Sequence, residues 1–130
     1  MKESDLDQFI QHHLSLLNPN GVLHDNEELI KRACKFLEAA AILNGYRTEL
    51  TDEHIKLKTV KEATFAKVMD RTEGKNAMER EARIDAHPEY VVAREEYESS
   101  DNHISSIKVY EAIFTNAHIM FRGISRDGQS

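Results

Sequence analysis

The stretch PEYVVAREEYESSDNHISSIKVYEAIFTNAHIMF, residues 88–121, decides the fold. Its apolar side chains recur at intervals of three and four, which is the period of one face of an α-helix. The main members of this face are Tyr90, Ala93, Tyr97, Ile104, Ile107, Phe114 and Phe121. Pro88 suits the first position of a helix, and Gly123 suits a left-handed C-cap after its end. We therefore predict a long helix over residues 88–122 and a flexible tail over 124–130.

A helix of this length needs an equally long partner, and residues 26–70 supply one. Their apolar residues follow the same period, and Asp25 or Asn26 suits the N-cap. Gly45 costs about 1 kcal/mol relative to alanine inside a helix, so the second helix is either continuous, kinked or broken near residues 45–52. Two long helices joined by a compact connector are expected to pack antiparallel.

Two shorter helices complete the prediction. Ser4 suits the N-cap of a helix over residues 4–17, which the turn-forming residues 18–21 bring to an end. Asn76, with Glu79 three residues later, favours a short helix over 76–86. The predicted fold is a single all-α domain over residues 1–130, a long antiparallel helical hairpin with a short N-terminal helix.

An elongated hairpin buries less surface per residue than a globule, so we expect it to oligomerise through its helical faces. The apolar stripe of the last helix is the candidate oligomer interface. Its residues are Tyr90, Tyr97, Ile104, Ile107, Phe114 and Phe121. The expected partner is thus further copies of the same chain.

Several classes of protein are disfavoured by composition. No apolar run approaches the roughly 20 residues of a membrane span, and the N-terminus lacks the core of a signal peptide. A single cysteine, Cys34, fits a reducing compartment. We therefore expect a cytoplasmic protein with no membrane contact, in the host cytoplasm if a phage encodes it.

Chemical motifs are also missing from the sequence. The seven histidines are scattered and show no metal-ligand spacing, and there is no glycine-rich phosphate loop or serine nucleophile elbow. Cys34 has no neighbouring base in the sequence, and acidic pairs such as Glu95-Glu96 read as a solvated helix face. We expect no enzymatic activity, no metal site and no cofactor.

The formal charge of −6 is unevenly distributed along the chain. Residues 1–55 carry −5 and residues 84–130 carry −4, whereas residues 56–83 carry +3. The cations of this middle segment are Lys56, Lys58, Lys61, Lys67, Arg71, Lys75, Arg80 and Arg83. They form either a solvated face paired with nearby carboxylates or a phosphate-binding tip for single-stranded DNA, since flexible cations at loose spacing suffice for phosphate contacts.

Three short segments resemble a known family in their order and type. They are Glu79-Arg80-Glu81-Ala82, His87-Pro88-Glu89-Tyr90 and Phe121-Arg122-Gly123-Ile124. Together with the helical pattern over residues 26–126, they resemble the phage recombination mediators of the UvsY type. The resemblance implies a ring of helical hairpins that loads a recombinase onto single-stranded DNA already covered by a single-strand-binding protein. It also implies that Arg80, Arg83 and Arg122 contact DNA or neighbouring subunits.

The sequence thus leads to three hypotheses. The first is a non-enzymatic recombination mediator that binds single-stranded DNA, a recombinase or a single-strand-binding protein as an oligomer. The second is a small acidic inhibitor or adaptor, encoded by a phage or mobile element, that occupies a host nuclease or defence complex. The third is a structural helical bundle without a ligand.

Overall fold

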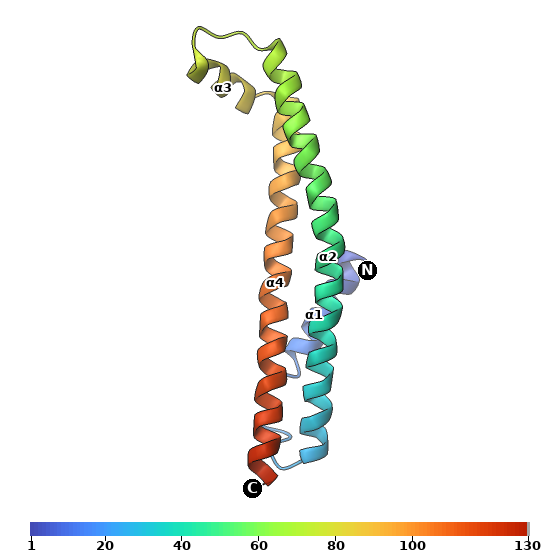
Figure 1. Ribbon diagram of the computed structural model, residues 1–130. Coiled ribbons are helices and arrows are strands. Elements are labelled where there is room, and N and C mark those ends of the chain that lie inside the picture. The colour runs from blue at the N-terminus through green and yellow to red at the C-terminus, as the bar shows by residue number, and fades with distance from the viewer. Residues whose placement is uncertain (130) are drawn as a thin grey trace. The chain divides into compact units, whose positions relative to one another are not determined.

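The computed structural model describes residues 1–129, and their side chains as far as Arg126. All of its elements are helices, as predicted, and Figure 1 shows them in order along the chain. They are α1 (Glu3–Leu14), α2 (Asn26–Arg71), α3 (Ala77–Asp85) and α4 (Pro88–Gln129).

The two long helices pass through two compact units. The terminal unit comprises Met1–Arg47 and Ser106–Ser130, and the central unit comprises Thr48–Ser105. Within each unit, segments of α2 and α4 pack against each other, which confirms the predicted helical hairpin. Oligomerisation through the helical faces stays a prediction.

Helix α2 begins where its capping residues predicted. The Asp25 carboxylate accepts a hydrogen bond from the Glu28 N–H at 3.1 Å, which satisfies one of the unpaired donors of the first turn. The helix then continues through Gly45 and through residues 51–52 without interruption. Nothing lies within 4 Å of the place where a Cβ on Gly45 would stand, so this glycine serves no close approach.

Helix α1 differs from the prediction at both ends. It begins at Glu3, its N-cap is Lys2, and no side chain caps it, so the proposed Ser4 cap is wrong. It ends at Leu14 rather than at residue 17. The Arg32 guanidinium of α2 donates to the carbonyl oxygens of Leu16 and Asn18, at 3.2 and 3.1 Å. A side chain from another helix therefore satisfies carbonyl groups that lie beyond the end of α1 and have no partner within that helix.

The end of α4 also differs from the prediction. The helix runs through Gly123 to Gln129, and no described glycine has a positive φ, so the proposed left-handed C-cap and the non-helical tail from residue 124 are wrong. Ser125 is buried, and its hydroxyl donates to Asn26 Oδ1 at 2.5 Å. This contact with the start of α2 favours continued helix and offsets the cost of glycine. Residue 130 of the predicted tail lies outside the described residues.

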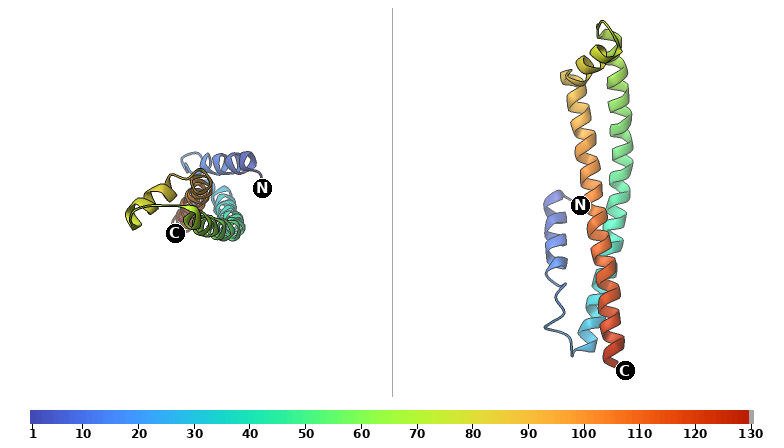
Figure 2. Two further views of the ribbon diagram at one scale, coloured as in Figure 1. Left: turned by 90° about the horizontal axis from the view of Figure 1, so that it is seen from above. Right: turned by 90° about the vertical axis from the view of Figure 1, so that its left-hand side faces the viewer.

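The core of the terminal unit is a cluster of aromatic rings. Phe36 of α2 lies 5.8 Å from Phe114 and 5.5 Å from Phe121 of α4, and all three are fully buried. His13 of α1 joins this cluster at 5.6 Å from Phe114. Figure 2 shows α1 lying alongside the α2 and α4 segments of this unit. The short first helix is thus held by a ring contact with both long helices.

A half-buried ion pair lies beside this core. The Arg47 Nε of α2 lies 2.5 Å from the Glu111 carboxylate of α4, and the Asn44 amide donates to the same carboxylate at 3.1 Å. Exclusion of solvent makes such a hydrogen-bonded pair stronger than an exposed one. The pair fixes the register of the two helices within the terminal unit.

The core of the central unit is smaller. Val68 of α2, Ile84 of α3 and Tyr90 of α4 form it, with the half-buried Phe65 packed against them. Helix α3 is capped as predicted, since Asn76 Oδ1 accepts from the Glu79 N–H at 2.9 Å. An added Cβ on Gly74 would lie 2.5 Å from Arg80 Cγ and 3.0 Å from Arg80 N, so the connector needs glycine at this close approach.

Candidate nucleic-acid interface

All eight cations of the predicted DNA-binding segment belong to the central unit. Five lie on α2, Lys75 lies in the connector, and two arginines lie on α3. Every one is exposed except the half-buried Lys61. The unit as a whole contains nine Lys or Arg residues against fourteen Asp or Glu residues, a formal charge of −5. The cations are therefore surrounded by an excess of carboxylates.

Two of the predicted cations converge on one carboxylate. Lys67 Nζ lies 3.6 Å, and Arg71 Nη2 lies 3.2 Å, from Oε2 of Glu89 in the first turn of α4. Lys67, and then Arg71, hold the pKa of the Glu89 carboxyl below its ordinary value of 4.5. These two side chains are therefore already paired with the Glu89 carboxylate of a neighbouring helix in the absence of nucleic acid.

The lowered pKa of Glu89 predicts a pH dependence of stability. The charged Glu89 carboxylate stabilises the folded state. This contribution is fully present above pH 4.5 and is lost as the pH falls through the lowered pKa of Glu89 in the folded state. Glu89→Gln should slightly lower the melting temperature at pH 7, and the difference from the unmodified protein should vanish well below pH 4.5. Thermal unfolding followed by circular dichroism across pH measures this. Glu95→Gln, an exposed position on the same helix, should show no such convergence.

The two α3 arginines have structural partners. Arg83 donates to the Glu79 carboxylate at 2.8 Å and to the Glu73 carbonyl at 2.9 Å. Arg80 donates to the Met69 carbonyl at the end of α2, at 3.2 Å. Both guanidinium groups tie α3 to the preceding chain, which gives them a role that needs no DNA.

The aromatic rings of the central unit are already in contact with protein groups. Tyr97 stacks on His54 with ring centroids 4.5 Å apart, and the Lys61 ammonium lies 4.3 Å from the same ring. Tyr90 is buried and meets Phe65 edge to face. Single-strand-binding proteins stack bases on exposed aromatic rings, so this unit lacks that source of affinity.

Three of the predicted cations are not paired with another group of the described chain. Within the described part of the chain, the side chains of Lys56, Lys58 and Lys75 have no ion pair or hydrogen bond. Lys56 and Lys58 are two residues apart on α2, so they point about 200° apart around the helix. The structure therefore does not bring the eight residues together into one patch; it pairs five and separates the rest.

The six predicted interface residues lie mostly inside the chain. Tyr90, Ile104, Ile107, Phe114 and Phe121 are buried, and Tyr97 is half-buried. The five buried side chains are covered by other segments of their own units, so they are not exposed for contact between copies, whereas Tyr97 stays a predicted interface residue. The periodicity identified the buried face correctly but not what covers it. The exposed apolar residues of the long helices are others, namely Ile30, Leu37, Ile42, Ile55, Val60, Met69, Val92, Val109, Ile119 and Met120.

A Ser-His-Asp cluster in the central unit was not foreseen from the sequence. His54 Nδ1 lies 3.1 Å from Ser100 Oγ, and His54 Nε2 lies 3.7 Å from Asp101. Ser100 lies in the middle of α4, where the neighbouring backbone N–H groups bond within the helix. The backbone N–H groups beside Ser100 are therefore not available to stabilise an oxyanion, as they do in the serine proteases.

The resemblance also suggested Arg122 as a contact residue. Arg122 belongs to the terminal unit, whereas the eight cations of the segment 56–83 belong to the central unit.

No group of three or more His, Cys, Asp or Glu side chains is arranged to hold a metal ion among the residues that the structure describes. None of the helices over residues 1–129 combines the length and the apolar character needed to cross a membrane.

Comparison with protein-family models, with curated proteins and with solved structures finds no match to this chain.

Proposed function

We propose that this chain is a non-enzymatic accessory protein of the recombination-mediator type. It binds single-stranded DNA through sequence-independent phosphate contacts, and it acts in the cytoplasm as a homo-oligomer beside a recombinase or a single-strand-binding protein. The observation that supports this most is the presence of exposed, unpaired ammonium groups at Lys56, Lys58 and Lys75, in a segment whose net charge is +3.

The contact made by one chain is expected to be weak. At most three phosphate contacts, with no exposed aromatic ring in the central unit, give a small, salt-sensitive affinity. Several copies on one strand add their contacts by avidity, because each further contact is made at a high effective concentration. The proposal therefore requires an oligomer, and light scattering should give a mass of several times 14.9 kDa.

Charge reversal of two lysines tests the DNA contact. Lys56→Glu with Lys58→Glu should weaken binding of a fluorescein-labelled oligo-dT at least tenfold in fluorescence anisotropy at low salt. The slope of log K against log salt should become shallower by about 0.7 for each of the two lysines that contacts a phosphate of the single strand. Both positions are exposed, so helicity should be unchanged.

The matched control reverses the same amount of charge elsewhere on α2. Lys31→Glu with Lys35→Glu changes two exposed lysines of the terminal unit and should leave the affinity within about twofold, because a distant charge acts only through the screened field. An equal loss of affinity in both double variants would mean that the net charge of the protein, and not a contact by Lys56 or Lys58, determines DNA binding. Absence of binding at low salt would remove the proposal altogether.

The acidic surface supports a second candidate, a protein-binding inhibitor or adaptor. Glu95, Glu96 and Glu98 are exposed on α4 within a unit of charge −5, and such a surface can imitate nucleic-acid phosphates. This candidate predicts no oligo-dT binding. It predicts instead a stoichiometric nuclease or defence-complex partner from host lysate, which Glu95→Gln with Glu96→Gln no longer captures.

A further inference from the structure

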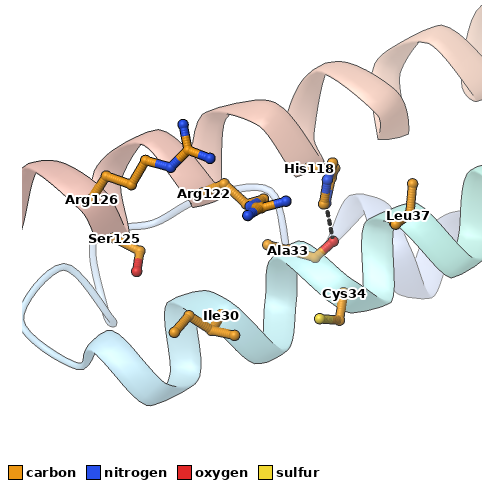
Figure 3. A pocket seen from close by; sticks show the side chains of 8 residues that line it. All are labelled: Ile30, Ala33, Cys34, Leu37, His118, Arg122, Ser125 and Arg126. Atoms are coloured by element: carbon orange, nitrogen blue, oxygen red, sulfur yellow. Dashed lines mark hydrogen bonds between the residues drawn. The ribbon is translucent and has the colours of Figure 1, made fainter.

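A groove in the terminal unit combines apolar and cationic side chains. Its volume is about 480 Å³, within the range of roughly 300–1,000 Å³ that is typical of ligand sites. Figure 3 shows its two banks, one from α2 and one from α4. The lining residues are Ile30, Ala33, Cys34 and Leu37 of α2, and His118, Arg122, Ser125 and Arg126 of α4.

The α2 bank is apolar and open to solvent. Ile30 is 45 % exposed and Leu37 is 51 % exposed, and Cys34 between them is exposed as well. Residues at this spacing share one face of the helix. Nothing within the described chain covers them, so they lose contact with water only when a partner binds.

The α4 bank is cationic. Arg122 and Arg126 are exposed, and neither forms an ion pair with a described carboxylate. Among the side chains that the structure describes, those as far as Arg126, no acidic residue lines the groove, although the whole chain has a charge of −6. A local positive site on an acidic protein is a strong selector for acidic groups, because carboxylates are repelled from most of the remaining surface.

His118 adds a third polar group with a defined orientation. Its Nδ1 lies 2.7 Å from the carbonyl oxygen of Ala33 across the groove, as the dashed line in Figure 3 shows. Because a carbonyl only accepts, Nδ1 carries a proton and donates it. The ring is thereby held in place, and Nε2 is the nitrogen left for a ligand.

We propose that this groove binds an acidic, apolar peptide segment of a partner protein. The segment places carboxylates against Arg122 and Arg126 and apolar side chains against Ile30 and Leu37. The two arginines are four residues apart, or about 6 Å along the helix axis. Alternate residues of an extended peptide are about 6.6–6.8 Å apart, so two carboxylates at positions i and i+2 can each meet one guanidinium.

A peptide fits this groove better than nucleic acid does. Phosphates could satisfy the arginines, but the described residues that line the groove include no aromatic ring for bases to stack on. The exposed isoleucine and leucine instead match aliphatic side chains. The inference is independent of the DNA contacts proposed for Lys56 and Lys58, which lie in the other unit.

The test uses a fluorescein-labelled octapeptide of alternating leucine and aspartate with the full chain. Saturable anisotropy at low salt is expected. The same peptide with asparagine for aspartate, or serine for leucine, should bind at least tenfold more weakly. Arg122→Glu with Arg126→Glu should weaken the Leu/Asp peptide at least tenfold, whereas Lys31→Glu with Lys35→Glu, a matched charge change in the same unit, should keep most of the affinity.

Cys34 provides a second readout in the unmodified protein. Its exposed thiol reacts with a maleimide, and the Leu/Asp peptide should slow that reaction severalfold at saturation. No saturable binding, equal binding by both double variants, or an unchanged thiol reaction rate would overturn the proposal. Binding of oligo-dT that Arg122→Glu with Arg126→Glu abolishes would also overturn it, by making the groove a phosphate site.

Discussion

Replacing Phe114 with alanine is expected to lower the free energy of unfolding of the terminal unit by about 3–5 kcal/mol. Phe114 is fully buried and lies within ring-contact distance of Phe36, Tyr110 and His13. Its removal leaves a cavity among three helices, since the surrounding rings cannot collapse fully into it. Such a loss is a large part of the 5–15 kcal/mol by which proteins of ordinary stability fold.

Urea unfolding followed by circular dichroism measures this loss, and hydrogen exchange locates it. Exchange should accelerate first in α1, whose ring contact with Phe114 disappears. Ile119→Ala is the matched control, because Ile119 lies on the same helix but is 62 % exposed. That variant should change stability by less than about 1 kcal/mol. Equal destabilisation by both variants would contradict the described packing.

Ile84→Ala should have the second largest effect, a loss of about 2–4 kcal/mol. Ile84 is the one fully buried apolar residue among the nine of α3, and it packs on the small core made with Val68 and Tyr90. A helix of nine residues is not stable by itself in water, so it depends on this anchor. We expect α3 to unfold locally while the long helices remain.

The expected signature is rapid amide exchange confined to residues 77–85, with little change in total helicity. Met78→Ala tests the specificity of the effect, since Met78 is on the same helix and is 80 % exposed. It should leave exchange in α3 unchanged to within about twofold. Protection of α3 that survives Ile84→Ala would mean that the hydrogen bonds of Arg80 and Arg83, rather than Ile84, hold this helix.

Local sequence signals predicted the helices where the capping is local. Asp25 and Asn76 cap α2 and α3 through their own side chains, and both starts are confirmed. The ends that depend on distant residues were predicted wrongly. Arg32 satisfies carbonyls after α1, and Ser125 bonds to Asn26 beyond Gly123. These contacts join residues that are 14 to 99 positions apart, and no local pattern encodes them.

The candidate site was predictable only as a list of charges. Counting residues located the cations of the segment 56–83, but not that Glu89 would neutralise Lys67 and Arg71 from another helix. The groove was missed because its two banks come from opposite ends of the sequence. Its only signal was the pair Arg122 and Arg126, four residues apart on one helical face with no acidic residue between them.

By itself, the sequence determined the helical class, the two long helices and the apolar face of each. Those properties follow from the 3.6-residue period and from capping groups within a few residues of each other. Only the tertiary structure decided that the apolar stripe of α4 is covered by its own chain, which cations remain unpaired, and where an open groove lies. Each of these depends on distances between residues far apart in the sequence, and those distances exist only once the helices have packed.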